Sequence, residues 1–360
     1  MSKIFKVGII GTGFGAKVHA PIFSHHPQFE VKAIASVARG NVNDIKEMTG
    51  IEQIYTNWRE MIEEEDLDLV SIASAPYLHH EMTLAAFEAG NHVLCEKPMA
   101  FNADESLAMI KARDKANKLG LINFEWRYLP ARLKVKEILA HQKLGKVLHI
   151  QYNCIFPGYE SSISTSRGWL GQEDKGGGFL GAIGSHMLDT LMWWTGEKIS
   201  SVYGQLHTYV PQNLQAPADE RELRTADDSF QVLGSFSNGT SLQMNLISTA
   251  RHALGWRLEI VGTEGTLVMT DDQEVLLGEN QGNLEPVELS PAAEAPSHFT
   301  HALSRYYPAF QPMVERLYLT LLNGDTRDIP TFEDGRNVQL IMDAIRASSK
   351  EGQRKQVVYP

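Results

Sequence analysis

The stretch KVGIIGTGFGA, Lys6–Ala16, decides the fold of this 360-residue chain. Gly11, Gly13 and Ala16 satisfy the pattern G-x-G-x-x-G/A directly after an apolar run that reads as a strand. The first glycine permits a tight turn, the second lets a pyrophosphate approach the backbone, and the third small residue lets a helix pack on the sheet. The stretch therefore predicts a dinucleotide-binding turn, with a turn kept only for packing as the alternative. The residues expected to bind the cofactor here are Gly11, Thr12, Gly13, Phe14 and Gly15.

The first third of the chain continues the alternation that this strand begins. Short apolar strands separated by helical patterns are typical of a parallel α/β sheet. The predicted strands are Lys6–Ile10, Val31–Ser36, Asp68–Ser74, His92–Glu96 and Leu121–Glu125. After about residue 123 the strands are joined instead by tight turns at Ser237–Gly239 and Thr263–Gly265, a pattern that predicts antiparallel hairpins.

Composition and charge exclude several classes of function. The net charge of −11, without a basic tract, argues against a nucleic-acid partner. Apolar runs are shorter than the roughly 18 residues of a membrane span, and the N-terminus lacks the apolar region of a secretory signal. Cys95 and Cys154 lack metal-ligand spacing, so we expect two buried, reduced thiols and no metal site. The chain is therefore expected to be soluble and cytoplasmic.

The end of the second predicted strand distinguishes NAD from NADP. An acidic side chain there binds the 2′-hydroxyl of NAD, whereas a nearby arginine accommodates the 2′-phosphate of NADP. The sequence has Ser36 and Arg39 at this point and no acid before Asp44. A serine hydroxyl can donate to a phosphate oxygen, and an arginine can pair with it. We therefore expect NADP to be preferred and NAD to be possible, unless Arg39 is only a surface residue.

The stretch LCEKPMA places Lys97 just beyond the fifth predicted strand. Ligands of open α/β sheets bind at this carboxyl edge. Pro98 forces Lys97 out of the helical region and allows a cis peptide bond. A lysine there can move the proton that an alcohol releases when it loses hydride. The alternative is a solvated surface lysine.

Three stretches together resemble the glucose–fructose oxidoreductase/inositol dehydrogenase/MocA family of pyridine-nucleotide dehydrogenases. They are GIIGTGFGA, IASAPYLHHEMTLAAFEAGNHVLCEKPMA and GGGFLGAIGSHMLD, and the resemblance covers essentially the whole chain. It implies an α/β protein with a Rossmann domain over 1–122, built on a doubly wound parallel sheet. It also implies a substrate-binding and oligomerisation α/β domain over 123–360, with an open, mainly antiparallel sheet. A C-terminal helix over 333–348 can pack back on the first domain, and dimers or tetramers form through the second sheet.

The resemblance also implies roles for individual residues. In the family, the EKP lysine, here Lys97, contacts both the nicotinamide ribose and the substrate. Arg127 matches an arginine of the substrate cleft. Leu170 stands where an arginine commonly follows the family's tryptophan, and Arg167 can substitute for it. Together with the glycine-rich turn and the strand tip, the cofactor residues so implied are Ser74, Pro76, His79, Glu96, Lys97, Arg167 and Trp169.

The family's substrate helix usually carries an aspartate four residues before its histidine. Here His186 stands at the histidine position, but Ala182 replaces the aspartate. A carboxylate at that position would hold the imidazole tautomer and stabilise its positive charge. Asp189, three residues after His186, can reach it from the other side, or it has only a structural role. We expect Lys97 and His186 to be catalytic, and Lys97, Arg127, His186 and Asp189 to contact substrate.

The function expected from this resemblance is hydride transfer between a nicotinamide cofactor and a sugar, polyol or related small carbonyl or alcohol compound. The alternative is a catalytically weak regulator or sensor of the same fold, which the missing aspartate at position 182 keeps open.

Overall fold

The computed structural model describes residues 3–36 and 42–359. They form two units: Met1–Tyr128 with Ala292–Arg336, and Leu129–Pro291 with Asn337–Pro360. The sequence predicts a boundary between a cofactor-binding domain and a substrate-binding domain at residues 122 and 123. This division by function stays a prediction.

The first unit is built on a six-stranded parallel sheet with the order β3-β2-β1-β4-β5-β6. This is the doubly wound order, and it confirms the predicted Rossmann sheet. The three-residue strand β3 was not predicted, because its residues are only half-buried or exposed and carry no apolar run. The strands are β1 (Phe5–Ile10), β2 (Phe29–Ala35), β3 (Gln53–Tyr55), β4 (Leu69–Ile72), β5 (His92–Cys95) and β6 (Gly120–Ile122).

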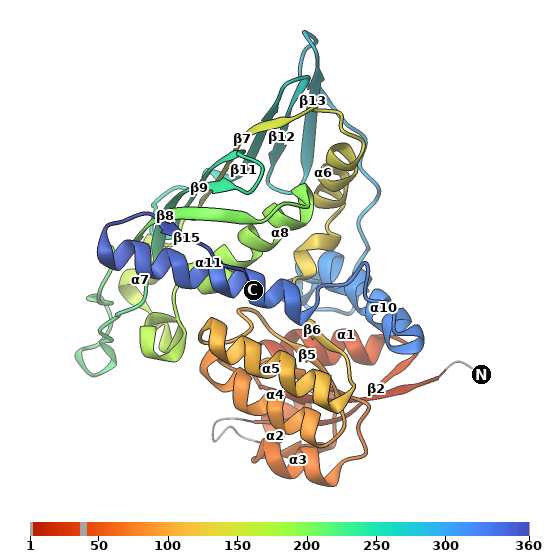
Figure 1. Cartoon of the computed structure of the whole chain (residues 1–360). Coiled ribbons are helices and arrows are strands. Elements are labelled where there is room, and N and C mark those ends of the chain that lie inside the picture. The colour runs from red at the N-terminus through yellow and green to blue at the C-terminus, as the bar shows by residue number, and fades with distance from the viewer. Residues whose placement is uncertain (1–2, 37–41, 360) are drawn as a thin grey trace. The chain divides into compact units, whose positions relative to one another are not determined.

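Helices join these strands, and Figure 1 shows α4 and α5 side by side. Asn57 caps α3 by accepting the amide proton of Arg59 at 3.1 Å. Phe310 of α10 packs on Phe23 of α1, with ring centroids 6.1 Å apart, and so extends the core over the first helix. The helices are η1, a π turn (Gly15–His19), α1 (Ala20–His25), α2 (Val42–Thr49), α3 (Trp58–Glu64), η2 (Pro76–Leu78), α4 (His79–Glu88), α5 (Ala103–Ala116), η3 (Glu125–Tyr128), α9 (His301–Ser304) and α10 (Tyr307–Asn323).

The second unit contains a nine-stranded sheet with the order β14-β13-β12-β11-β7-β10-β9-β8-β15. Among the described strands of this sheet, only the β10–β7 pair is parallel, so the expectation of a mainly antiparallel sheet is confirmed. Both predicted hairpins form, as β9–β10 and β11–β12. The strands are β7 (Val147–Ile155), β8 (Ile199–His207), β9 (Ser229–Phe236), β10 (Ser241–Ile247), β11 (Gly255–Gly262), β12 (Gly265–Thr270), β13 (Glu274–Glu279), β14 (Glu285–Pro286) and β15 (Lys355–Gln356).

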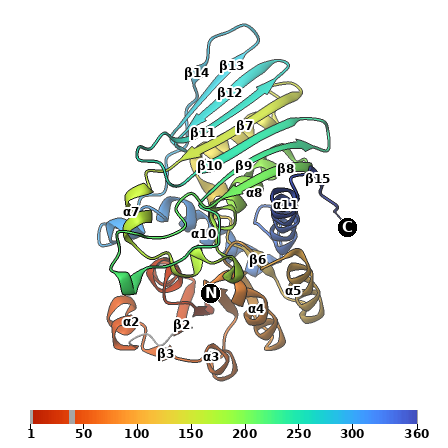
Figure 2. The ribbon, with the colours of Figure 1, turned by 90° about the vertical axis from the view of Figure 1, so that its left-hand side faces the viewer.

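Helices α8 and α11 lie against one face of this sheet (Figure 2). The fully buried Arg132 of α6 ties the layers together, because it pairs with both carboxylate oxygens of Asp272, at 2.9 and 3.0 Å. It also donates to the hydroxyl of Tyr152 at 2.7 Å. The helical segments are α6 (Pro130–Ala140), α7 (Tyr159–Ser164), η4 (Gly168–Gly171), η5 (Glu173–Lys175), η6, a π turn (Leu180–Gly184), α8 (Ser185–Thr195), η7 (Ala218–Glu220) and α11 (Phe332–Glu351).

Among the described residues, none of the helices combines the length and the apolar character that crossing a bilayer requires.

Candidate functional site

The glycine-rich turn between β1 and η1 has the geometry of a phosphate cradle. Gly11 has φ +121°, and a Cβ there would stand 2.3 Å from the carbonyl oxygen of Ala73, so only glycine fits. Apart from Gly13 itself and its two chain neighbours, no described residue places an atom within 4 Å of the Cβ position of Gly13, which leaves its backbone open to a ligand. Gly15 packs closely against Ile9 of β1. The helix therefore already contacts the sheet one residue before Ala16, the small residue that the motif places at this contact. Amide groups at such a helix start bind pyrophosphate, and the turn fits a dinucleotide.

The side chains of this turn differ in exposure. Thr12 is half-buried, and Phe14 packs edge-on against Tyr306 with ring centroids 5.0 Å apart. A cavity of about 920 Å³ borders Gly13 and Phe14 and continues along α1 as far as His25. The predicted cofactor turn is therefore accessible within the first unit.

Ser36 lies at the tip of β2, as predicted, but its side chain is buried and its amide donates to the carbonyl of Tyr55 at 2.9 Å. Arg39 lies outside the described residues. The 2′-phosphate contact expected of these residues stays a prediction.

The loop after β4 is held to the turn after β5 by His79. This imidazole is fully buried, with Nε2 3.1 Å from the carbonyl oxygen of Ser74 and Nδ1 3.0 Å from that of Pro98. Burial lowers the pKa of His79, although the two carbonyls oppose the shift. Ser74 is half-buried and Pro76 is buried. His79 thus joins these two backbone segments, and its contact with the cofactor stays a prediction.

Lys97 follows β5 at the carboxyl edge of the sheet, where its side chain is half-exposed. The Lys97–Pro98 peptide is cis. The preceding residue, Glu96, is 7% exposed, and its Oε2 accepts the amide proton of Lys97 at 3.2 Å. The ends of β1, β4 and β5, which are neighbours in the sheet, therefore bring the glycine-rich turn, the His79 loop and Lys97 to one edge.

Glu96 is the centre of a buried polar network that the sequence did not reveal. His19, which is fully buried at the end of η1, places Nε2 3.0 Å from Glu96 Oε1 and Nδ1 2.7 Å from the hydroxyl oxygen of Ser71. The side-chain amide of Asn123 also donates to Oε1. Burial by itself would raise the pKa of Glu96, but His19, Lys97 and Asn123 together hold it below its ordinary value. The carboxylate thus accepts three hydrogen bonds, from the His19 ring, the Asn123 side chain and the Lys97 backbone, which favour its ionised form.

Arg127, predicted to contact substrate, lies at the end of the first segment of the first unit. Its side chain is buried, and Nη2 lies 3.2 Å from a carboxylate oxygen of Asp334. A guanidinium paired in this way is held in place, and its contact with substrate stays a prediction.

In the second unit, the triple glycine forms a closely packed turn that leads into η6 and α8. A Cβ at Gly177 would stand 2.4 Å from the carbonyl oxygen of Trp169, and one at Gly178, with φ +103°, would stand 2.1 Å from Asp227 Oδ1. Asp227 Oδ2 accepts the amide proton of Leu180 at 2.8 Å and so caps the helical segment that follows. Burial raises the pKa of Asp227 to about 6, although the hydrogen bond from the Leu180 amide opposes this shift.

The predicted substrate residues lie on the segment that follows. Ala182 is half-buried in the π turn η6, while His186 and Asp189 on α8 are each 1% exposed. A π turn at this point is a common feature of functional helices. Because residue 182 is an alanine, this turn lacks the carboxylate that the family usually has at this position.

The two residues expected to reach the cofactor from this unit lie before the triple glycine. Arg167 donates to the hydroxyl of Ser162 at 2.6 Å, and its guanidinium lies over the ring of Phe179, 5.3 Å from the centroid. Burial lowers the pKa of Arg167, and the nearby Arg224 adds to the effect. Trp169 is 39% exposed. Their cofactor contacts stay predictions.

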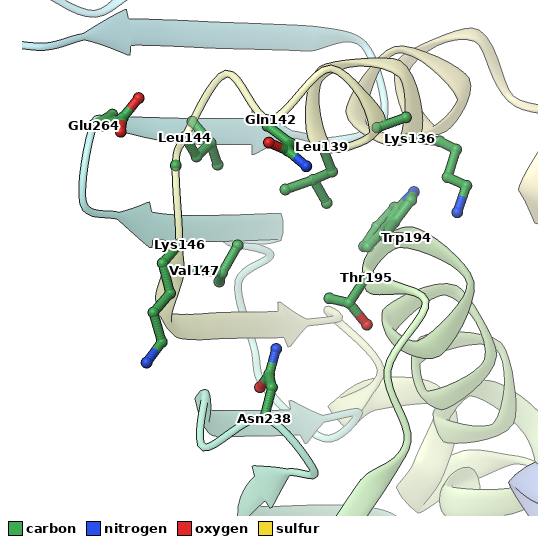
Figure 3. A pocket seen from close by; sticks show the side chains of 12 residues that line it. Lys136, Leu139, Gln142, Leu144, Lys146, Val147, Trp194, Thr195, Asn238 and Glu264 are labelled. Atoms are coloured by element: carbon green, nitrogen blue, oxygen red, sulfur yellow. The ribbon is translucent and has the colours of Figure 1, made fainter.

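A separate cavity of about 550 Å³ lies at the far end of α8 from His186, beside Trp194 and Thr195 (Figure 3). Its two lysines, Lys136 and Lys146, extend in different directions, and Lys136 donates to the carbonyl oxygen of Trp193. The cavity is therefore no part of the predicted substrate site.

Comparison with known proteins gives matches over most of the chain. The family model described as "Oxidoreductase family, NAD-binding Rossmann fold" matches residues 5–124, and that described as "GFO/IDH/MocA C-terminal domain" matches residues 133–268. An uncharacterized oxidoreductase of Synechocystis sp. is 32% identical over 268 residues, which are 74% of this chain and 71% of that protein.

Levoglucosan dehydrogenase of Pseudarthrobacter phenanthrenivorans is 27% identical over 384 residues, which cover 95% of each chain. A solved structure of levoglucosan dehydrogenase in complex with NADH and L-sorbose has a TM-score of 0.88 and 25% identity, and covers 100% of both chains. Another solved structure contains NADH and levoglucosan, with a TM-score of 0.87 and 25% identity over 99% of this chain and 100% of that one.

Proposed function

The chain belongs to the Gfo/Idh/MocA family of NAD(P)-dependent oxidoreductases, and from this premise we propose that it acts on a sugar, a polyol or a related small carbonyl or alcohol compound. The observation that carries the proposal is the common edge at which the glycine-rich turn and Lys97 lie. The comparisons give no support to the alternative of a dinucleotide-binding regulator.

The substrate class is supported by a relative. Levoglucosan dehydrogenase is seen with levoglucosan and with L-sorbose, both of which are carbohydrates. Because that protein aligns along the whole chain, we propose that the present enzyme also oxidises or reduces a sugar carbon.

The proposed roles of the chain's residues follow from proton balance. Bound nicotinamide supplies the hydride acceptor in one direction and the hydride donor in the other. The hydroxyl proton must leave as hydride leaves its carbon, and we assign its transfer to His186. Lys97 orients and polarises the reacting oxygen or relays its proton. Arg127 and Asp189 hold the substrate, and Asp189 is also the candidate to replace the carboxylate missing at Ala182.

The cofactor contacts are proposed for the glycine-rich turn, the Ser74–His79 loop, Glu96–Lys97, Arg167 and Trp169. We also propose the preference for NADP that Ser36 and Arg39 indicate, with NAD as the competing cofactor. The structures of levoglucosan dehydrogenase contain NADH, which favours NAD for that relative. Titration of the protein with NADPH and NADH, followed by nicotinamide fluorescence, distinguishes them. Tighter binding of NADH would overturn the NADP preference.

We propose a homodimer or homotetramer that forms through the sheet of the second unit. The face opposite the helices carries uncharged side chains across three neighbouring strands, including Tyr203, Gln231, Leu233, Gln243 and Asn245, which line a depression of about 330 Å³. A face with so little charge in a chain of net charge −11 suits self-association. Gln243→Arg should yield monomers in light scattering, and an unchanged assembly would refute this interface.

A cytoplasmic location is also part of the proposal. Cys95 and Cys154 are buried free thiols, and burial raises the pKa of each, so neither is poised for oxidation. Reduced thiols suit a reducing compartment.

Turnover with a panel of sugars and polyols tests the proposed function. The panel should include levoglucosan and L-sorbose, each with NAD⁺ or NADP⁺ and, for carbonyl compounds, with the reduced cofactors. Reduction or oxidation of nicotinamide by at least one carbohydrate supports the proposal. Tight cofactor binding without turnover of any of them would contradict it.

A further inference from the structure

The polar network of His19 and Glu96 lies between the two turns to which the proposed function assigns the cofactor. His19 ends the π turn η1, which begins at Gly15 of the glycine-rich turn. Glu96 immediately precedes Lys97. Although 77 residues separate His19 from Glu96 in the chain, their side chains meet at 3.0 Å. A single hydrogen bond therefore connects the start of the first helix with the EKP turn.

The imidazole has little freedom to move. Its ring is fully buried and packs on the ring of Phe310, with centroids 4.7 Å apart, and on that of Phe14 at 5.3 Å. The second ring nitrogen is fixed by Ser71 of β4 at 2.7 Å. His19 thus contacts the glycine-rich turn through Phe14, the central strand through Ser71 and the EKP turn through Glu96.

The chemistry of the contacts defines the proton on Nε2. The Glu96 carboxylate accepts from the Asn123 amide and from the backbone amide of Lys97, so it is an acceptor toward His19 as well. Nε2 therefore carries a proton and donates. Without this donor the buried Oε1 would keep only the Asn123 amide, so the carboxylate would lose part of the compensation for its burial and the turn at Lys97 would be held less firmly.

We propose that His19 is a positioning residue that fixes the Glu96–Lys97 turn against the glycine-rich turn, so that cofactor affinity and the placement of the Lys97 amine depend on one buried hydrogen bond. This inference rests on the proposed function, because the two turns are assigned to the cofactor there. It predicts that loss of the His19 donor weakens cofactor binding even though His19 itself is buried beneath the site.

His26 offers a matched control in the same unit. It is 6% exposed, and its Nε2 lies 3.0 Å from the carboxylate of Glu315, so it repeats the histidine–glutamate pair at a place remote from Lys97 in the chain. His26→Leu removes such a pair without touching either turn. His19→Gln retains an amide donor toward Glu96 and an acceptor toward Ser71, and serves as the rescue.

The experiment compares the dissociation constants for NADH and NADPH and the thermal midpoints of wild type, His19→Leu, His19→Gln and His26→Leu. We expect His19→Leu to raise the cofactor dissociation constant by about 10- to 100-fold, the range that corresponds to losing one hydrogen-bond partner of a buried charged group. His19→Gln should recover most of the affinity, and His26→Leu should bind cofactor as wild type does, whatever its thermal midpoint.

The inference is overturned if His19→Leu binds cofactor within about twofold of wild type, or if His26→Leu weakens binding equally. If His19→Leu does not fold, Glu96→Gln, which keeps the shape of the side chain and removes its charge, should weaken binding in the same direction. Wild-type affinity in a folded Glu96→Gln would also overturn it. Cofactor affinity requires no substrate, so a wild type that binds cofactor but converts no sugar would refute the proposed function and leave this test intact.

Discussion

Two glycines of the nucleotide-binding turn should respond in opposite ways to the same added methyl group. At Gly13, no described residue beyond its two chain neighbours places an atom within 4 Å of the position that the methyl carbon would take, and its φ is not in the left-handed region. Gly13→Ala should therefore change the free energy of unfolding by less than about 1 kcal/mol. The methyl group instead occupies the space through which pyrophosphate approaches the backbone, so cofactor affinity should fall about tenfold or more, which is about 1.4 kcal/mol.

At Gly11, the methyl carbon would stand 2.3 Å from the carbonyl oxygen of Ala73, and φ is +121°. Backbone in this region costs a non-glycine residue about 1–3 kcal/mol, and relieving the clash requires a shift of about 1 Å. Gly11→Ala should destabilise the first unit by about 2–4 kcal/mol and lower its thermal midpoint by on the order of 5–10 °C.

The assay measures both quantities for both variants: the thermal midpoint by scanning calorimetry, and the NADH and NADPH dissociation constants by fluorescence titration. Gly13→Ala with wild-type affinity would refute the assignment of this turn to the cofactor. Gly11→Ala with a wild-type midpoint would refute the steric reasoning.

Two further predictions concern the second unit. The pKa of Asp227 is raised to about 6 in the folded chain, so this carboxyl stabilises the fold fully below about pH 4, and about 3 kcal/mol is lost as the pH rises through 6. Asp227→Asn should make the thermal midpoint less dependent on pH in this range. An unchanged pH dependence would contradict the assignment of this effect to Asp227. Arg132→Met leaves Asp272 without its guanidinium and should cost about 3–5 kcal/mol. Adding Asp272→Asn should recover part of the loss, and calorimetry that finds both single and double variants as stable as wild type would count against the buried pair.

The fold was predictable because its signals are local. The apolar runs at β1 and β2 and the hairpin turn after Phe236 show their structure within a few residues. Helix ends are harder to read from the sequence: the helical pattern after Asn102 can extend to Gly120, but α5 ends at Ala116, its C-cap Asn117 has a left-handed conformation, and Gly120 already belongs to β6. An asparagine tolerates that conformation almost as readily as a glycine, so the sequence offered two possible ends.

The residues of the candidate site could be predicted only where they belong to a short sequence motif. The positions of Gly11, Gly13 and Lys97 follow from short patterns, and the structure places them at one edge of the sheet. The bond between His19 and Glu96 joins residues 77 positions apart, and no local pattern indicates it. The capping role of Asp227 depends likewise on a contact with a segment 47 residues earlier in the chain. Pairs of this kind become visible only when tertiary packing is known.

The central claim is that His186 transfers the proton that accompanies hydride transfer on a carbohydrate, and that Lys97 orients and polarises the reacting oxygen or relays its proton. It is tested most directly by the rate of nicotinamide reduction at saturating cofactor and sugar, measured for wild type, Lys97→Ala and His186→Ala, with cofactor affinity determined for each. The account predicts a loss of about 10²- to 10⁴-fold in both variants, with cofactor binding retained in His186→Ala. A wild-type rate in either variant would contradict it.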